Sequence, residues 1–363
     1  MKNLNFPITK TKTAGVEKKF DLNTLTGRKE YFLAKVGPEV KIIKDYLAEG
    51  KTFLGFLLGK KNSGKGTYSK LFMEIVGSEH VGHLSVGDLV RDIHKSVETE
   101  EGKKELMDFL KAHYRGFHSP EETIDLILGR SQSTLISSEL ILALIEFEIS
   151  KRPRQAIFLD GFPRAFDQIS YSLFLKQLIG FRDDPDFLVF IDVPEAVIDQ
   201  RIKTRVICPV CHTPRSPRLN ITKEIGYDGS KSEFYLMCDN PECHKARMVP
   251  KEGDELGIEP IRERLETDDK ISAHLLKLHG VDKVFLRNSL PADKALEYVD
   301  HYEITPAYSF ERETDGKIKV IESPWTISDD DGVQSYSLLP AAVALTMIKQ
   351  IAGILEKKSN SVR

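Results

Sequence analysis

Residues 59–67 read GKKNSGKGT and follow an apolar run at 52–58. A glycine, four residues and then Gly-Lys is the P-loop spacing, in which glycines let backbone N–H groups curl around phosphate oxygens and the following helix adds a positive dipole. Lys65 would supply a charge for the β- and γ-phosphates. An ordinary lysine-rich turn is the alternative, but the strand before and the helix after favour a nucleotide site. Gly66 stands where most P-loops place a Mg²⁺-binding hydroxyl, so acidic residues elsewhere must hold that metal.

Residues that could complete such a site follow another apolar run, at 156–159. Asp160 ends this run, and Gly161 and Arg164 belong to the turn after it. In open α/β sheets, ligands bind at the carboxyl ends of the strands. We therefore expect the Asp160 carboxylate beside the P-loop and the Arg164 guanidinium group over the cleft, where it can bind phosphate. A structural ion pair between the two residues is the alternative.

Two further pairs of arginines differ in their spacing. Arg201 and Arg205 are four residues apart in a helix predicted at 195–205, so they share one helix face. Two neighbouring guanidinium groups repel each other unless an anion lies between them, which favours phosphate contact over a solvated face. Arg262 and Arg264 are two residues apart and cannot share a face, so only one of them should reach the phosphates.

All four cysteines fall into two close pairs, Cys208 with Cys211 and Cys238 with Cys243. Two thiolate pairs on short turns, joined by a hairpin-length spacer, are what a tetrahedral Zn²⁺ site needs. Four buried, reduced cysteines without metal are the alternative. Because the cysteines lie far from Lys65 in sequence, we expect a structural zinc with no open position for water.

The elements that carry these motifs predict a doubly wound α/β core. Short apolar runs at 52–58, 83–85, 156–159 and 187–191 each lead into a helical pattern, and 318–321 is expected to be the fifth strand. This alternation is typical of a parallel sheet covered on both faces. The last helix is predicted at 342–357, with one apolar stripe that should pack on the sheet: Val343, Met347, Ile348, Ile351 and Leu355.

Two stretches that interrupt the alternation, at 91–139 and 206–254, have the character of insertions after strand ends, which could cover a ligand. The basic stretch through Lys19 is expected to be a mobile or loosely docked arm. We expect an N-terminal extension at 1–50, core segments at 51–85 and 139–205, insertions at 86–138 and 206–254, and a final core segment at 255–363 with an extra insertion around 266–300.

Composition restricts the class of protein. A chain of 363 residues can form one large domain with insertions, or two domains. Its 52 basic and 55 acidic residues leave a net charge of −3, so no general basicity predicts a nucleic-acid or membrane surface. We find no signal peptide or membrane span, and expect a cytoplasmic protein whose cysteines bind metal.

Four motifs, in this order, resemble those of the adenylate kinase and nucleoside monophosphate (NMP) kinase family. They are the P-loop ending GKGT, LSVGDLVR at 84–91, IFLDGFPR at 157–164, and VP at 193–194 leading to Arg201 and Arg205. The resemblance implies a five-stranded parallel P-loop core, an NMP-binding insertion at 86–138 and, as in one branch of the family, a zinc-bearing lid at 206–254. It also implies transfer of the γ-phosphoryl group of MgATP to an NMP, with AMP as the expected acceptor.

The resemblance assigns roles to individual residues. Catalytic roles fall to Lys65, Arg164, Arg205 and Arg264. ATP binding falls to Gly59, Ser63, Gly64, Lys65, Gly66, Thr67 and Arg201. NMP binding falls to Ser85, Val86, Arg91, Ile136, Gly161, Arg164 and Gln168. Asp88 and Asp160 would hold Mg²⁺ through water, and Cys208, Cys211, Cys238 and Cys243 would hold zinc.

Some positions depart from the family pattern. Asn62 stands where glycine is usual, and Lys251 is only a candidate for a basic residue of the lid. Val86 replaces the threonine beside the AMP base, whereas Gln168 matches a glutamine that contacts AMP. A CMP, UMP or deoxynucleotide kinase is therefore an alternative.

An alternative of another class is a non-catalytic nucleotide sensor, or a nucleic-acid-binding zinc protein, on a kinase-like core. The long N-terminal stretch and the enlarged insertions support it, and the retained basic residues argue against it. We expect a monomer that binds ATP and an NMP, and neither membrane nor nucleic acid.

Overall fold

The computed structural model describes residues 6–129, 137–181 and 183–361, and its centre is a five-stranded sheet. The strand order is β10-β4-β1-β3-β2, and every neighbouring pair is parallel. The strands are β1 (Leu54–Leu58), β2 (Val81–Ser85), β3 (Ala156–Asp160), β4 (Asp186–Asp192) and β10 (Asp282–Arg287). All five residues of β1 are buried, because this central strand is covered on both faces. The parallel P-loop core with five strands is confirmed.

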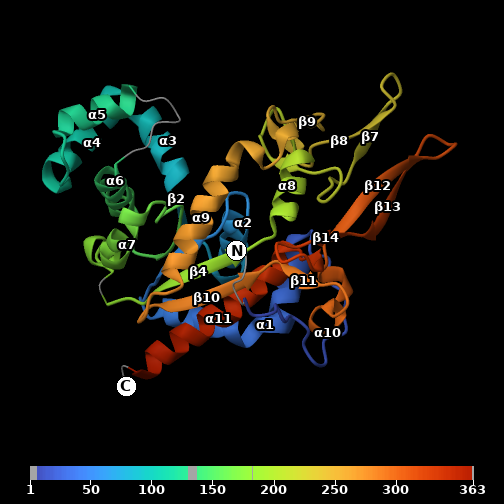
Figure 1. The fold of residues 1–363 in the computed structure, drawn as a ribbon, viewed down its shortest axis with the longest axis horizontal. Helices are drawn as coiled ribbons and strands as arrows, with labels where there is room; N and C mark the ends of the chain where they lie inside the picture. The colour runs from blue at the N-terminus through green and yellow to red at the C-terminus, as the bar shows by residue number, and fades with distance from the viewer. Residues whose placement is uncertain (1–5, 130–136, 182, 362–363) are drawn as a thin grey trace.

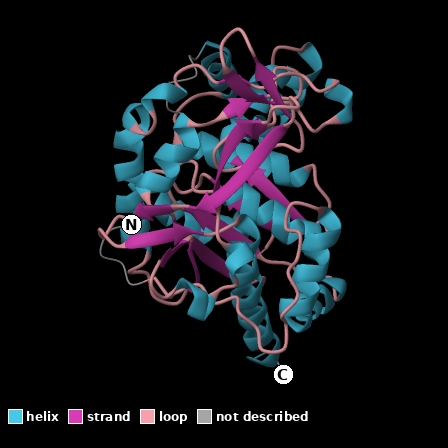
Figure 2. Ribbon diagram, turned by 90° about the vertical axis from the view of Figure 1, so that its right-hand side faces the viewer, coloured by secondary structure: helices cyan, strands magenta, loops and turns pink. Residues whose placement is uncertain are grey.

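Helices pack on both faces of the sheet, which confirms the doubly wound architecture (Figures 1 and 2). One face carries α1 (Leu25–Ala48), α2 (Lys65–Val76) and α11 (Pro340–Ser361). The other carries α3 (Val86–Ser96), α6 (Ser138–Ser150), α7 (Phe166–Leu178) and α9 (Arg262–Leu275). The apolar stripe predicted for the last helix is buried in the first of these layers.

The fifth strand is not the one expected. The core strand is β10, inside the stretch around 266–300 where an insertion was expected, whereas Ile318–Pro324 is β13 and pairs only with β12 (Pro306–Arg312) among the described residues. The edge strand β10 reads DKVFLR and fully buries only Val284 and Leu286. The alternation of charged and apolar residues in β10 did not indicate a core strand. The apolar run IKVI, which did, belongs instead to an exposed hairpin.

The N-terminal stretch is docked, contrary to the expectation of a mobile or loosely held arm. Phe6 is buried and its ring lies edge-on to that of Phe285, with 5.6 Å between centroids. The Thr9 hydroxyl donates to the carbonyl of Arg287 at 2.7 Å, and that of Thr11 donates to buried Glu303. Lys10, Lys12, Lys18 and Lys19 are exposed, whereas Phe6, Thr9 and Thr11 are buried, so basic composition alone misled the prediction.

Between α3 and α6 lie two further helices, α4 (Glu100–His113) and α5 (Pro120–Gly129), which pack against each other. Apolar residues on α4 and α5 join the cluster formed by α3 and α6. Figure 1 shows this helical group on one side of the molecule and the cysteine-bearing segment on the other.

Residues 206–254, here called the lid segment, form a small β module after α8 (Glu195–Lys203). One sheet has the order β6-β5-β9 and a hairpin pairs β7 with β8. These elements are β5 (Val206–Ile207), β6 (Pro214–Arg215), β7 (Ile225–Asp228), β8 (Glu233–Leu236), η1 (Pro241–Cys243) and β9 (Val249–Pro250), followed by η2 (Asp254–Leu256) and η3 (Glu259–Ile261). Cysteines, Leu236 and Met248 form its core.

The connection from β10 to α11 is itself a folded unit. It contains β11 (Ser289–Pro291), α10 (Ala295–Tyr298), η4 (His301–Glu303), the β12–β13 hairpin, β14 (Thr326–Ser328) and β15 (Gln334–Ser337). Strands β11, β15 and β14 form a sheet beside the core. The β12–β13 hairpin extends to the lid segment (Figure 1), where the Tyr308 N–H donates to the Arg218 carbonyl at 2.8 Å. Across the described parts of the chain, we find no helix with the length and apolar character to span a membrane.

Candidate active site

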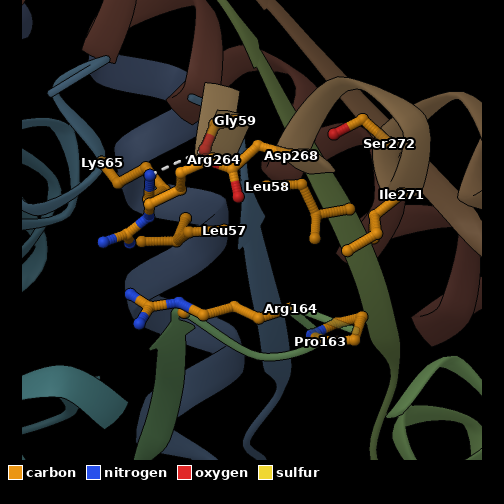
Figure 3. Close-up of a pocket in the computed structure, with 11 residues that line it drawn as sticks. Leu57, Leu58, Gly59, Lys65, Pro163, Arg164, Arg264, Asp268, Ile271 and Ser272 are labelled. Carbon is orange, nitrogen blue, oxygen red and sulfur yellow. Dashed lines mark hydrogen bonds between the residues drawn. The ribbon is translucent and has the colours of Figure 1, made fainter. Parts of the chain in front are cut away.

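An open pocket lies at the carboxyl ends of the core strands, between the P-loop, the turn after β3 and α9 (Figure 3). Its lining combines apolar strand ends with charged side chains from three separate elements. The lining residues are Leu57, Leu58, Gly59, Lys65, Gly161, Pro163, Arg164, Arg264, Asp268, Ile271 and Ser272. In Figure 3 the guanidinium groups of Arg164 and Arg264 point to the same side of the pocket as the Lys65 ammonium group.

The Lys65 side chain is hydrogen-bonded to the backbone of the P-loop. Lys65 begins α2, and its Nζ donates to the carbonyls of Gly59 at 2.8 Å and Lys60 at 3.0 Å. Asn62 adopts a left-handed conformation with φ 65°, so the departure from glycine at this position keeps the tight turn, because asparagine tolerates that conformation. Gly64 is also left-handed. Ser63, Gly66 and Thr67 complete the loop and the first turn of α2.

Arg164 crosses the pocket because Gly161 gives it room. A Cβ atom at Gly161 would lie 2.6 Å from Arg164 Nη2, so any larger residue would displace the guanidinium group. The buried Gln168 accepts a hydrogen bond from the Arg164 backbone N–H at 2.7 Å, which fixes the turn. A Cβ at Gly87 would lie 3.8 Å from Arg91 Nη1 and 4.0 Å from Arg164 Nη2, so these two guanidinium groups approach the same point.

The first turn of α3 carries residues that the family resemblance assigns to NMP binding. Ser85 caps this helix, with its hydroxyl accepting from the Asp88 N–H at 3.3 Å, and Val86 is buried next to it. Arg91, one turn further, pairs with Asp88. Ile136 lies outside the described residues.

Positive charge accumulates at this pocket. Burial lowers the pKa of Lys61, and the nearby charges of Arg264, Lys251, Arg205 and Arg164 lower it further. The pKa of Lys65 is also lowered, first by burial, with Arg164 and Arg264 adding to the effect and two carboxylates opposing it. Basic groups from the P-loop, the β3 turn, α9 and the lid segment therefore repel one another, and a bound polyanion would relieve that repulsion.

The prediction from residue spacing holds for Arg262 and Arg264, but Arg201 and Arg205 do not share one helix. Arg264 lines the pocket, whereas Arg262 pairs with Glu259 at 2.5 Å, so only one of the two reaches the site. Helix α8 ends at Lys203, before Arg205, because the chain turns there into β5. Arg205 instead forms a bidentate pair with Asp254. Arg201 lies on α8. Burial raises the pKa of Tyr68 at the start of α2, and the charge of Arg201 lowers it by a smaller amount.

Asp160 is suited to bind a cation. Its Oδ2 lies 3.9 Å from His83 Nε2 and its Oδ1 lies 3.9 Å from Lys65 Nζ, both beyond hydrogen-bond distance. The buried Oδ1 has no hydrogen-bond partner among the residues that the structure describes. An ionised oxygen in that position gains from a metal ion or its water ligands. Asp160 pairs in register with Ser85, the cap of the helix that carries Asp88, so both acidic residues lie at the same edge of the sheet.

Asp268 is a pocket residue that the sequence interpretation missed. Its carboxylate accepts a hydrogen bond from the Lys61 backbone N–H at 3.2 Å, and burial raises its pKa while Lys65 and two arginines lower it. The available signal was its position four residues after Arg264, which puts both residues on one face of α9.

The four cysteines come together as predicted. Cys208, Cys211, Cys238 and Cys243 bring their sulfur atoms within 4.8 Å of one another. Tetrahedral coordination with metal–sulfur bonds of about 2.3 Å requires sulfur atoms roughly 3.8 Å apart, so this geometry fits a four-thiolate metal site. The sulfurs of Cys211 and Cys238 are 3.6 Å apart.

Comparison with known proteins relates the chain to adenylate kinases. An adenylate kinase of Thermotoga petrophila is 34% identical over 157 residues, which are 42% of this chain and 59% of that protein. One from Kosmotoga olearia is 31% identical over 158 residues, 43% of this chain and 60% of the relative. An adenylate kinase of Clostridium novyi is 28% identical over 250 residues, 68% of this chain and 96% of the relative. The match to the Thermotoga protein thus spans about three fifths of its length. No family model matches the chain.

Proposed function

We propose that this chain, which is similar to adenylate kinases, transfers the γ-phosphoryl group of MgATP to an NMP, with AMP as the acceptor. The observation that carries this proposal is the convergence of basic residues from opposite sides of one pocket. Lys65 enters from the P-loop, Arg164 from the turn after β3 and Arg264 from α9, and the guanidinium group of Arg91 on α3 approaches that of Arg164. Two phosphate-bearing ligands that meet at this point would be held by different groups of cations.

The residues suit a transfer that needs positioning and charge neutralisation rather than a general base. The acceptor is a phosphate oxygen that is already ionised at neutral pH. We assign the donor phosphates to Lys65 and the backbone N–H groups of 63–67, and the acceptor phosphate to Arg91 and Arg164. Arg264, which lies close to Lys61, Lys65 and Arg164, would neutralise charge on the transferring group.

The remaining roles extend this assignment. Asp88 and Asp160 would hold Mg²⁺ through water, and the ion would neutralise the phosphate oxygens of ATP. Arg205 would reach the transferring group from the position just before the lid segment, and Arg201 would lie against ATP. Residues 86–138 would bind the NMP, with Ser85, Val86, Gly161 and Gln168 at its edge. Residues 206–254, held together by zinc at the cysteine cluster, would close over ATP and exclude water in a chain that acts as a monomer.

Replacement of single charges tests the proposal. Lys65→Ala and Arg164→Ala should each lower turnover by ~10²–10³, because each removes a preorganised charge from the reacting phosphates. Arg262→Ala is the matched control, since this arginine lies on the same helix as Arg264 but pairs with Glu259. The measurement is ADP formation from ATP with AMP, CMP, UMP and dAMP in turn. Near-normal turnover in either pocket variant, or no ADP with any acceptor, would refute the proposal.

A further inference from the structure

Lys60, the second residue of the P-loop, is a buried lysine whose ammonium group is surrounded by acids. Its Nζ lies 2.9 Å from Asp330 Oδ2, 3.1 Å from Glu195 Oε1 and 3.5 Å from Asp269 Oδ2. Only 2% of its side chain is exposed, and it does not line the pocket that Lys65 enters. Burial favours the neutral amine, but the three carboxylates outweigh it and raise the pKa of Lys60, so the side chain is charged at neutral pH.

The three acids that surround Lys60 belong to three separate elements. Glu195 begins α8, which carries Arg201, and Asp269 lies on α9 next to Asp268. Asp330 lies in the turn between β14 and β15, far along the chain, and its Oδ1 accepts the Glu195 N–H at 2.7 Å. One ammonium group therefore connects the P-loop to both arginine-bearing helices and to the unit between β10 and α11.

The same residue also touches Lys65 through its backbone. The Lys60 carbonyl accepts a hydrogen bond from Lys65 Nζ at 3.0 Å, so the peptide that supports Lys65 is the one anchored by the buried side chain. On α9, Asp268 accepts the neighbouring Lys61 N–H. The P-loop and α9 are thus joined by a side-chain ion pair and a backbone hydrogen bond at consecutive residues, one turn from Arg264.

We propose that Lys60 is a positioning residue for phosphoryl transfer, whose link to Asp330, Glu195 and Asp269 sets the P-loop and Lys65 at a fixed distance from Arg264 and Arg201. This role rests on the function proposed above. Donor and acceptor phosphates must approach in line, and a displacement of about 1 Å can reduce the rate by ~10². A P-loop that shifts relative to α9 would still bind nucleotide but would misalign it.

A purely structural role makes a different prediction. Removing one member of a buried ion cluster leaves uncompensated charge and destabilises the fold, whatever its effect on catalysis. Stability and turnover can be separated by comparing Lys60→Met with the double variant Lys60→Met/Asp330→Asn, which also removes the charge of one carboxylate that contacts Lys60. The double variant should regain thermal stability in either case, whereas turnover should recover only if the role is structural.

The experiment measures the unfolding temperature, the affinity for a non-hydrolysable ATP analogue, the KM for AMP and kcat. Lys60→Met should lower kcat by ~10–100-fold and leave the KM for AMP within about twofold, and the double variant should stay at low kcat despite its recovered stability. Lys41→Met, which breaks an exposed pair with Asp45, is the control and should match wild type. Recovery of kcat in the double variant, or a change in KM for AMP alone, would overturn the proposal.

Asp330→Asn alone provides a test if Lys60→Met does not fold. It keeps Lys60 charged between Glu195 and Asp269, so kcat should fall by ~3–10-fold with little change in the unfolding temperature. An unchanged kcat would count against the positioning role. An inactive wild-type protein would instead refute the proposed function, so the two failures are distinguishable.

Discussion

The guanidinium group of Arg205 donates two hydrogen bonds to the carboxylate of Asp254, from Nε at 2.6 Å and from Nη2 at 2.7 Å. Arg205 directly precedes the lid segment, next to β5, and Asp254 is the last residue of that segment, at the start of η2. This planar pair fixes the direction of Arg205 where the lid meets the core. The orientation of Arg205 thus depends on a residue at the other end of the lid segment.

Asp254→Asn should lower kcat by about tenfold, because an amide offers one acceptor oxygen and no charge, so Arg205 loses its fixed direction. The measurement is steady-state ADP formation at saturating ATP and AMP. Glu255→Gln, at the exposed neighbouring position, is the control and should leave kcat unchanged. Equal activity in the two variants would contradict the orienting role of Asp254.

The affinity for ATP should fall as the pH rises, and this fall should begin at a lower pH than the pKa of an ordinary lysine would predict. Burial and the neighbouring arginines lower the pKa of Lys65 in the free protein, so Lys65 loses its charge earlier than usual as pH rises. Bound phosphate favours the charged form, so binding should take up protons at alkaline pH. Calorimetry with a non-hydrolysable ATP analogue, in buffers of different ionisation enthalpy, measures this uptake.

Two lysine variants separate the sources of that uptake. Lys65→Arg should abolish the part due to Lys65, because arginine stays charged, and Lys61→Arg should remove the part due to Lys61, whose pKa is also lowered by burial. Proton uptake that survives both replacements would show that neither lysine titrates in this range.

Purified protein should contain one zinc ion per chain. Four-sulfur coordination in small modules contributes on the order of 10 kcal/mol, which here is folding free energy of the lid segment. Cys238→Ser should therefore lose the metal and the hydrogen-exchange protection of residues 206–254, while the core sheet stays folded and turnover falls. His212→Ala, beside the cluster but outside it, should keep the metal. Carefully prepared protein that lacks zinc, yet is fully active, would rule this out.

Val86 should loosen the selectivity for AMP. Its buried side chain at the start of α3 cannot donate or accept a hydrogen bond, whereas a threonine hydroxyl can contact a base. Val86→Thr should raise the preference for AMP over CMP, UMP and dAMP by roughly tenfold, judged from kcat/KM. If wild type already uses AMP alone across this panel, Gln168 rather than position 86 selects the base.

The β12–β13 hairpin should stabilise the lid segment. The Phe310 ring lies 5.6 Å from that of Phe234 on β8 and packs against the cysteine cluster. Phe310→Ala removes an aromatic contact of about 1 kcal/mol and should speed hydrogen exchange in β7 and β8 several-fold. Val320→Ala, an exposed change on the same hairpin, serves as the control. Equal exchange in both variants would show that the contact does not support the lid.

The parts of the site that could be predicted from the sequence are those encoded within a few neighbouring residues. The P-loop, the turn from Asp160 to Arg164 and the cysteine pairs each fix their local geometry through glycines, caps or short spacings. Position 62 shows the same principle, since asparagine reproduces the left-handed turn. Local chemistry was therefore a sufficient guide at these places.

The remaining features depend on contacts between distant residues. Asp330 is 270 residues from Lys60, and Asp268 is 207 residues from Lys61, so neither pairing has a local signal. Strand β10 was missed because an edge strand keeps charged residues on its exposed positions. The anchoring of Phe6 and Thr9 likewise depends on β10, at the other end of the chain.

The contact between the β12–β13 hairpin and the lid segment limits how the lid can move. A segment that is connected to the core only by two neighbouring stretches of chain can rotate about a hinge axis through those connections. A third contact away from this axis prevents the rotation. Here the third contact is the β12–β13 hairpin, through the hydrogen bond from Tyr308 to Arg218 and the contact between Phe310 and Phe234. The closure proposed above would have to break these contacts or carry the hairpin with the lid segment. If the hairpin moves with the lid segment, we expect the chain to bend at the base of the hairpin. Pro306 faces Pro324 there, and neither residue has a backbone N–H that could hydrogen-bond between the two strands.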